Sequence, residues 1–127
     1  MRIGIVNDMA LAREALRRVI VSAPGLAIAW TARDGAEALD FNSNDPADLI
    51  LMDLSLPRMD GWEATKRIRL DDRFRSTPVI ALTAHAGRDD EQRARAAGCS
   101  DYLTKPVERD KLLGVIRKHL STRRLHA

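Results

Sequence analysis

Residues 48–53 have the sequence Asp48-Leu49-Ile50-Leu51-Met52-Asp53, in which four adjacent apolar side chains lie between two carboxylates. An unbroken apolar run of this length is typical of a strand that is buried on both faces. Such strands occur in parallel sheets that are covered by helices on both sides. The segment therefore predicts a central strand in an α/β domain.

Short apolar runs alternate with longer amphipathic segments on both sides of this strand. Further strands are predicted at residues 3–6, 26–30, 78–82 and 101–104. Longer amphipathic segments predict helices near residues 11–22, 34–41, 60–70 and 89–97, and a last helix after Pro106. Asp34 and Glu37 have the spacing of a capping box. Five strands that alternate with five helices predict a five-stranded parallel sheet, doubly wound by helices.

The size and composition favour one intracellular domain. A chain of 127 residues is typical of a single domain, and we expect it to span residues 1–121, followed by a short tail at 122–127. The single cysteine, Cys99, cannot form an internal disulfide, which favours a reducing compartment. We see no signal peptide and no segment long enough to span a bilayer. We therefore expect a cytoplasmic protein without membrane contact.

Charge is distributed unevenly along the chain. Residues 1–64 contain ten acidic and six basic side chains, a balance of −4, whereas residues 65–127 contain eight acidic and fifteen basic ones, a balance of +7. Most of the arginines are interleaved with acids at helical spacing, as on a solvated helix face. There is no helix-turn-helix, zinc-ligand or aromatic–basic pattern, so we expect no direct binding to nucleic acid. A solvated helix face is the simpler interpretation of the basic half, and an acidic protein partner is the alternative.

The predicted strands end in polar residues. These are Asn7-Asp8 after the first strand, Asp53 at the end of the third, Thr83 after the fourth and Thr104-Lys105 at the end of the fifth. The carboxyl ends of parallel strands lie along one edge of the sheet, and ligands of such sheets bind beyond that edge. We therefore expect two carboxylates, a hydroxyl and an ammonium group to meet there.

These groups suit the transfer of a phosphoryl group. Asp8 and Asp53 offer oxygen ligands to a hard cation such as Mg²⁺. A carboxylate can also act as a nucleophile and form an aspartyl phosphate. The cation and Lys105 would neutralise negative charge on the phosphoryl oxygens, and Thr83 can donate a hydrogen bond to one of them.

Four segments together match a known family. They are Asn7-Asp8, the run from Met52 to Gly61, Ala81-Leu82-Thr83-Ala84, and the run from Asp101 to Pro106. Over essentially the whole chain, the sequence resembles the receiver domain of bacterial two-component response regulators. The resemblance implies a flavodoxin-like, CheY-like fold with strand order 2-1-3-4-5.

The resemblance also implies a metal site. Asp53 would accept the phosphoryl group, and Mg²⁺ or Mn²⁺ would bind to Asp8, Asp53 and the backbone carbonyl of Ser55. Many receivers have a second carboxylate at the position of Asn7. In this chain the Asn7 amide would contact the metal through water. Because the amide keeps an oxygen but lacks the charge, we expect weaker Mg²⁺ binding and not the loss of the site.

Further residues are assigned by the resemblance to phosphoryl binding and switching. Thr83, Lys105 and the backbone of Ala84 would contact the phosphoryl group, and Lys105-Pro106 would be a cis peptide. Thr83 and Tyr102 would form the switch. Two further residues would tune the lifetime of the phosphoryl group by flanking the attacking water, namely Ser55 and His85.

The implied function is phosphorylation-dependent signalling. A histidine kinase or a histidine phosphotransfer protein would phosphorylate Asp53, and the domain would catalyse only its own phosphorylation and dephosphorylation. Phosphorylation adds about −1.5 to −2 charges and would alter the face formed by residues 89–97, residues 101–104 and the last helix. A downstream protein would bind this face. Its candidate contacts are Arg88, Arg93, Arg95, Arg109, Lys111 and Lys118.

Other interpretations fit the sequence less well. A pseudo-receiver scaffold would act without phosphorylation, but such domains usually lose the acceptor or the lysine, and this chain has Asp53 and Lys105. A phosphatase of the haloacid dehalogenase type needs Asp-x-Asp after its first strand, and Asp8 is followed by Met9-Ala10. A flavodoxin-like nucleotide binder would need a Ser/Thr/Gly-rich loop there. We expect a stand-alone receiver, and a receiver cut from a longer protein would have the same features.

Overall fold

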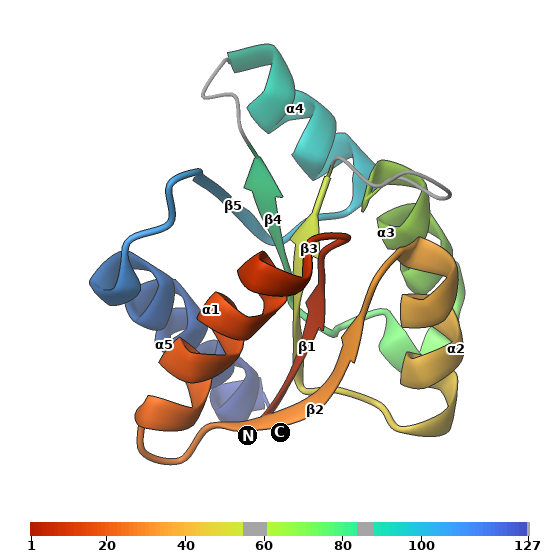
Figure 1. Cartoon of the computed structure of the whole chain (residues 1–127). Helices are drawn as coiled ribbons and strands as arrows, with labels where there is room; N and C mark the ends of the chain where they lie inside the picture. Colours follow the sequence, from red (N-terminus) through yellow and green to blue (C-terminus); the bar gives the residue numbers. More distant parts are fainter. Residues whose placement is uncertain (55–60, 84–87, 127) are drawn as a thin grey trace.

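A sheet of five parallel strands forms the centre of the molecule. The computed structural model describes residues 1–54, 61–83 and 88–126. The strands are β1 Arg2–Val6, β2 Ala27–Ala32, β3 Leu49–Asp53, β4 Val79–Thr83 and β5 Asp101–Thr104. Their order is β2-β1-β3-β4-β5, which confirms the predicted topology (Figure 1). In this order the chain reverses its winding direction between β1 and β3, where ligands of such sheets bind.

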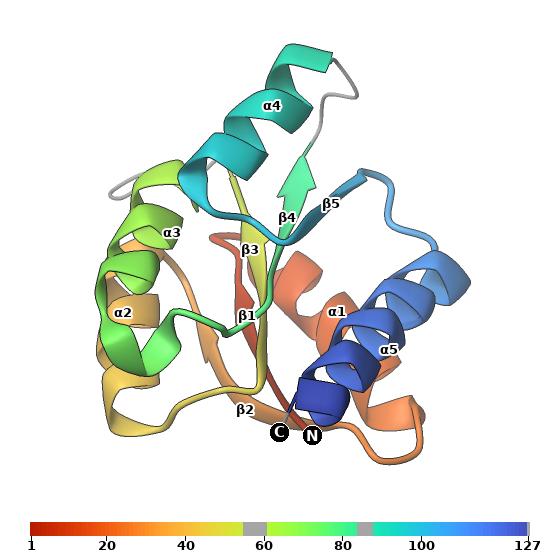
Figure 2. The same cartoon turned by 180° about the vertical axis from the view of Figure 1, so that it is seen from behind.

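Helices cover both faces of the sheet. Within the described residues they are α1 Ala10–Ser22, α2 Gly35–Asn44, α3 Gly61–Leu70, α4 Arg88–Ala97 and α5 Arg109–His126, and a short 3₁₀ helix, η1 Asp72–Phe74, precedes β4. Helices α1 and α5 pack on one face, and α2 and α3 pack on the other (Figures 1 and 2). Helix α5 continues past residue 121, where we expected the domain to end. No helix in the described ranges is long and apolar enough to cross a membrane.

The β3 strand confirms the prediction made from its apolar run. Every residue of β3 is buried. Ile50 and Met52 belong to the hydrophobic cluster on the side of α2 and α3, whereas Leu49 and Leu51 belong to the cluster on the side of α1 and α5. Burying an aliphatic side chain of this size contributes about 1.5–3 kcal/mol. The run therefore determines that β3 lies between both helical layers.

The β2 strand begins and ends later than predicted. A register shift between β1 and β2 pairs Gly4 with Trp30. Trp30 is 8% exposed, and its indole N–H donates to the carbonyl oxygen of Asp45 at 3.0 Å. A Cβ atom on residue 4 would lie 2.6 Å from the Trp30 ring. Glycine thus permits a close contact that the hydrophobic pattern of β2 does not reveal.

The capping box before α2 forms with one change in its partner. The Oδ1 atom of Asp34 accepts a hydrogen bond from the backbone N–H of Glu37 at 2.9 Å, as predicted. The Glu37 carboxylate in turn accepts from the backbone N–H of Arg33 at 2.8 Å, one residue before the cap. The helix ends three residues later than predicted because the N–H of Asp45 still donates to the carbonyl oxygen of Phe41.

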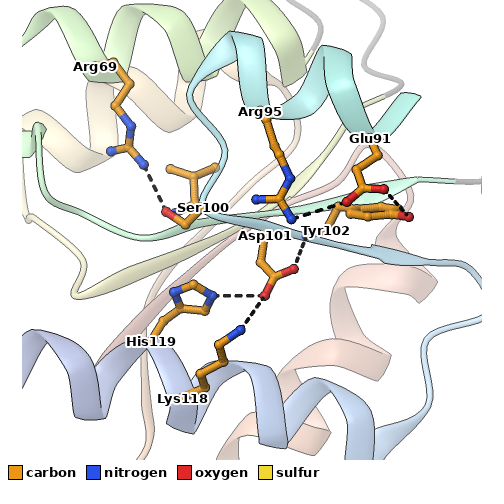
Figure 3. A network of polar contacts seen from close by, with 9 residues as sticks. Arg69, Glu91, Arg95, Ser100, Asp101, Tyr102, Lys118 and His119 are labelled. Carbon is orange, nitrogen blue, oxygen red and sulfur yellow. Dashed lines mark hydrogen bonds and ion pairs between the residues drawn. The ribbon is translucent and has the colours of Figure 1, made fainter. Parts of the chain in front are cut away.

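Arg69 connects several elements at the far end of α3. Its Nε donates to the carbonyl oxygen of Gly98 at 2.8 Å, and its Nη1 donates to those of Phe74 at 3.0 Å and Thr77 at 2.6 Å. Its Nη2 reaches Ser100 Oγ at 3.3 Å (Figure 3). Burial lowers the pKa of the Arg69 guanidinium. One side chain thus joins α3 to the segments that lead into β4 and β5.

Cys99 lies in the core and does not have the environment of a nucleophile. It is 7% exposed, and its Sγ atom lies 3.8 Å from Thr65 Oγ1. Burial raises the pKa of the thiol. Reactive cysteines have a lowered pKa and some exposure, so Cys99 is a packing residue between β5 and α3.

Candidate functional site

The carboxyl ends of the strands bring the predicted site residues to one edge of the sheet. Asp53 is the last residue of β3 and Thr83 is the last residue of β4. Asn7 follows β1 directly, and Lys105 follows β5. Because all strands are parallel, these four residues lie along the same edge, the upper one in Figure 1. The predicted gathering of these positions is therefore present in the fold.

Asp53, on the central strand, pairs with Lys105, which follows the outermost strand β5. Asp53 is 3% exposed, and Lys105 Nζ lies 3.2 Å from its Oδ1 atom. The backbone N–H of Lys105 donates to the carbonyl oxygen of Thr83 at 2.7 Å, which places the base of the lysine beside β4. The Lys105-Pro106 peptide is cis, as the resemblance implied. A buried carboxylate is stable only with such partners, so the edge combines an anionic oxygen with a neighbouring cation.

Gly61 allows α3 to begin directly against the acceptor strand. Its backbone N–H donates to the carbonyl oxygen of Leu54 at 3.3 Å. A Cβ atom on residue 61 would lie 2.7 Å from the Cα of Leu54 and still nearer to the carbonyl oxygen of Asp53. Real Cβ atoms do not approach backbone so closely. The glycine thus positions the first turn of α3 next to Asp53.

The turn after β1 carries one exposed and one buried polar residue. Asp8 is exposed, whereas Asn7 is 2% exposed. The Asn7 Oδ1 atom accepts a hydrogen bond from the backbone N–H of Met9 at 2.9 Å. An amide oxygen has two lone pairs, so one remains for the water-mediated metal contact that we predicted. The hydrogen bond that the structure shows for the Asn7 side chain is nevertheless made to the backbone of its own turn.

The oxygen atoms at this edge suit a hard divalent cation. Asp53 contributes a buried carboxylate, and Asp8 contributes an exposed one on the neighbouring turn. Mg²⁺ binds through one or two carboxylates and retains several waters. Among the residues that the structure describes, no group of three or more His, Cys, Asp or Glu is arranged to bind a metal. A cation here would therefore depend on these two carboxylates and on oxygens of other kinds.

Three predicted positions lie outside the described residues. They are Ser55, whose carbonyl is the expected third metal ligand, Ala84, whose backbone is an expected phosphoryl contact, and His85, an expected tuning residue. Their roles stay predictions.

A hydrogen bond from Tyr102 joins β5 to helix α4. It is half-buried, and its Oη donates to Glu91 Oε2 at 3.4 Å (Figure 3). The same carboxylate pairs with Arg95 one turn later, at 3.4 Å. The Glu91–Arg95 pair has the spacing of a helical ion pair and is visible in the sequence. The Tyr102–Glu91 contact cannot be predicted from the sequence, because it depends on how α4 packs on β5.

Asp101 connects β5 to α5 in the same region. Its Oδ2 lies 3.1 Å from His119 Nε2 and 3.7 Å from Lys118 Nζ, and its Oδ1 accepts from the backbone N–H of Tyr102 at 2.9 Å (Figure 3). Burial raises the pKa of Asp101, but the hydrogen bonds from His119 and from the Tyr102 N–H, together with the Lys118 charge, outweigh it and lower the pKa overall. The packing of α5 on β5 brings His119 to Asp101, a pairing of residues 18 positions apart that sequence spacing does not reveal.

The basic residues predicted to meet a partner differ in their surroundings. Arg93 lies over the Trp62 ring, 4.5 Å from its centroid, and Arg95 pairs with Glu91. Both side chains therefore already have contacts that position α4. Lys111 is 71% exposed, and its Nζ lies 3.9 Å from Glu108 Oε2, a long contact that makes Lys111 the better probe of a partner.

Surface hollows lie on two sides of this edge in the part of the chain that the structure describes. One of about 240 Å³ lies between the start of α1 and the segment after β5, and its lining includes Leu16, Lys105 and Val107. The other, of about 270 Å³, lies between β5 and the start of α5, and its lining includes Tyr102 and Lys111. The first borders the site, and the second lies on the face expected to bind a downstream partner.

The fold matches a known protein family. Residues 3–117 match the model of the response regulator receiver domain. The chain belongs to this family. Receiver domains are signalling domains of two-component systems and not classical enzymes, and they interact with histidine kinases and with downstream partners.

Curated relatives are similar over nearly the whole receiver domain. The polar-differentiation response regulator DivK of Brucella anthropi is 41% identical over 116 residues, which cover 91% of this chain and 93% of that protein. DivK of Brucella ovis is 40% identical over the same shares of both chains.

Solved structures agree with the receiver fold. A two-component response regulator of the LuxR family from Aurantimonas has a TM-score of 0.88 at 35% identity, covering 95% of this chain and 85% of that one. The receiver domain of a sensor histidine kinase from Pseudomonas aeruginosa has a TM-score of 0.85 at 33% identity, covering 94% and 97%, and contains a magnesium ion in its active-site cleft. Vibrio cholerae CheY4 has a TM-score of 0.86 at 28% identity, covering 92% and 96%.

Proposed function

We propose that this receiver domain, within residues 1–121, accepts a phosphoryl group on Asp53 in the cytoplasm with a bound Mg²⁺ or Mn²⁺. The observation that carries the proposal is the ion pair between the buried Asp53 and Lys105, 3.2 Å apart at the carboxyl edge of the sheet. A nucleophilic carboxylate next to a fixed cation is what transfer of an anionic phosphoryl group requires. The magnesium ion in the active-site cleft of the similar Pseudomonas aeruginosa receiver domain supports the proposal of a metal site in this chain.

The proposed step transfers a phosphoryl group from a histidine donor. An Asp53 oxygen attacks phosphorus, the bond from phosphorus to the donor imidazole nitrogen breaks, and the imidazole leaves as an acyl phosphate forms. Lys105 and the Thr83 hydroxyl would bind the phosphoryl oxygens, and Asp8 would hold the cation with Asp53 and the Ser55 carbonyl. When bound, the cation neutralises charge on the reacting phosphoryl oxygens.

The surface beside the site supports a protein donor. Met9 is 61% exposed and Leu11 is 83% exposed at the start of α1, and the hollow lined by Leu16 and Val107 lies next to them in the fold. Exposed apolar side chains next to a reactive group mark a contact surface for a protein. Leu11→Glu should therefore slow phosphotransfer from a kinase or phosphotransfer protein, and it should leave phosphorylation by a small phosphodonor unchanged.

The proposed output is a change of the face formed by α4, β5 and α5. Thr83 would move toward the phosphoryl group, and Tyr102 would turn inward from its contact with Glu91. A ligand that binds one of two states more tightly shifts the population to that state. Lys111→Glu should weaken binding of an acidic downstream partner, because the lysine is exposed beside Tyr102. Unchanged binding would contradict this assignment of the face.

Intact mass after incubation with acetyl phosphate and Mg²⁺ tests the chemistry. The wild-type chain should gain one phosphoryl group, and Asp53→Asn and Asp8→Ala should not. Asp48→Asn is the matched control, because Asp48 lies just before the other end of the same strand and accepts from the Arg2 N–H at 2.7 Å. A wild-type chain that gains no phosphoryl group would instead favour the pseudo-receiver alternative.

A further inference from the structure

We propose that Arg13 is a positioning residue for the metal ligand Asp8, which it orients by binding the backbone of Asn7. The inference rests on the proposed function, because it assigns a control of the same cation site. It concerns a side chain from α1 that has no oxygen to offer the metal. Its effect would pass entirely through the turn at residues 7–9.

This turn is bonded at three points around Asp8. The N–H of Asn7 donates to the carbonyl oxygen of Ala32 at 3.0 Å, and its Oδ1 accepts from the N–H of Met9 at 2.9 Å. The carbonyl oxygen of Asn7 accepts from Arg13 Nη1 at 2.8 Å. Asn7 itself is 2% exposed. The peptide group that joins Asn7 to Asp8 is therefore fixed by Arg13, while the Asp8 side chain remains exposed for a ligand.

Helix α1 gives Arg13 a fixed base. The backbone N–H of Arg13 donates to the carbonyl oxygen of Met9 at 3.0 Å, the first turn of the helix. The half-buried side chain extends back toward β1 and bonds the residue before Asp8. A charged donor to a carbonyl oxygen forms one of the stronger hydrogen bonds. Position and strength together make Arg13 suitable for orienting the turn.

Two effects of Arg13 on cation binding have opposite signs. As a positive charge near the site, Arg13 repels Mg²⁺, so its removal would tighten binding if charge dominated. As the donor to Asn7, it orients Asp8, so its removal would weaken binding if geometry dominated. Residues that orient metal ligands typically change affinity by 10- to 100-fold. The direction of the change therefore separates the two effects.

A third possibility is that Arg13 only stabilises α1. The N-cap residue Met9 makes no side-chain capping bond, so the Arg13–Asn7 bond contributes to the start of the helix. A purely structural role would lower the free energy of unfolding and leave the Mg²⁺ affinity of the folded protein unchanged. Affinity measured well below the unfolding temperature distinguishes this role from positioning.

Titration calorimetry with Mg²⁺ tests the inference on the full chain. Arg13→Met should weaken Mg²⁺ binding by about tenfold, and Arg13→Lys should recover part of the loss, because an ammonium group can still donate to a carbonyl. The defect should persist at high salt, where repulsion between separated charges is screened. Arg17→Met is the matched control. Arg17 lies one turn later, has the same charge and pairs with Glu14, so its loss should leave the affinity unchanged.

Several outcomes would overturn the inference. They are equal or tighter Mg²⁺ binding by Arg13→Met, an equal loss in Arg17→Met, and no recovery in Arg13→Lys when both variants are folded by circular dichroism. A wild-type chain that does not bind Mg²⁺ at all would overturn the proposed metal site, and this inference with it. Normal Mg²⁺ binding by both wild type and Arg13→Met would overturn only the inference.

Discussion

Gly61 begins α3 and Gly114 lies inside α5, and their surroundings give the same substitution opposite effects. Residue 61 touches the backbone at the end of β3, where an added Cβ atom would lie 2.7 Å from the Cα of Leu54, the residue after the strand. Residue 114 lies on the exposed face of α5, where a Cβ atom would meet nothing within 4 Å. Glycine inside a helix costs conformational entropy relative to alanine. Only at position 61 does the steric overlap of an added Cβ atom outweigh the entropy that alanine would save.

Gly61→Ala should therefore lower the free energy of unfolding by about 1–3 kcal/mol through overpacking. Gly114→Ala should raise it by about 0.5–1 kcal/mol, because the unfolded chain loses freedom. Urea denaturation measures both values. A stabilising Gly61→Ala would contradict the close approach of α3 to Asp53, since helix propensity alone would then decide the outcome.

Helix α4 is packed less firmly than α5. Of the side chains described in α4, the apolar residues it buries are Ala94 and Ala97, whereas α5 buries Leu112, Leu113 and Ile116, among others. Alanine removes much less apolar area from water than leucine or isoleucine. Polar contacts at Glu91 and Arg93 supply part of the remaining attachment of α4. Under the proposed function, an element held in this way would move at a lower cost than α5.

Hydrogen exchange should show this difference directly. Amides of residues 91–97 should exchange through local openings about tenfold or more faster than those of residues 112–120, because fewer buried apolar contacts oppose the opening. Exchange measured by NMR under native conditions gives both rates. Equal protection of the two helices would mean that α4 opens only with the whole domain.

The attachment of α5 to β5 should depend on acidity. The folded-state pKa of Asp101 lies below its ordinary value of 3.8. The contribution of its contacts to stability is therefore fully present above the unfolded-state pKa and is lost as the pH falls through the folded-state pKa. The difference in free energy of unfolding between wild type and Asp101→Asn should shrink below about pH 4. A difference that grows on acidification would reverse the sign of this linkage.

At the scale of the whole molecule, a cation that binds only the folded chain should stabilise all of it. Binding energy adds to the free energy of unfolding whenever the unfolded chain lacks the site. At a Mg²⁺ concentration about ten times its dissociation constant, the gain should be about 1.4 kcal/mol. Urea denaturation with Mg²⁺ and after addition of a chelator measures it. The gain should be kept in Asp48→Asn and lost in Asp8→Ala, and a gain in both variants would place the cation elsewhere.

The fold was largely predictable because burial leaves a local pattern in the sequence. The run from Leu49 to Met52 predicted a strand buried on both faces, and β3 is buried at every residue. Strand and helix ends were less predictable. The β2 strand moved because of the Gly4–Trp30 contact, and α2 gained a turn through its bond to Asp45. The Gly4–Trp30 contact joins residues that are distant in sequence, and the end of α2 depends on a single backbone hydrogen bond that the hydrophobic pattern does not reveal.

The sequence by itself determined which residues meet at the carboxyl edge, because a parallel sheet brings every strand end to one side whatever the details of packing. The positions of Asp53 and Lys105 at this edge were predictable for that reason, whereas their ion pair is a contact that the tertiary structure supplies. Only the tertiary structure decided which neighbour each polar side chain binds. The bond from Arg13 to Asn7 and the contact of Tyr102 with Glu91 depend on the angles at which helices pack on the sheet. Those angles cannot be predicted from the pattern of apolar and polar residues along the chain.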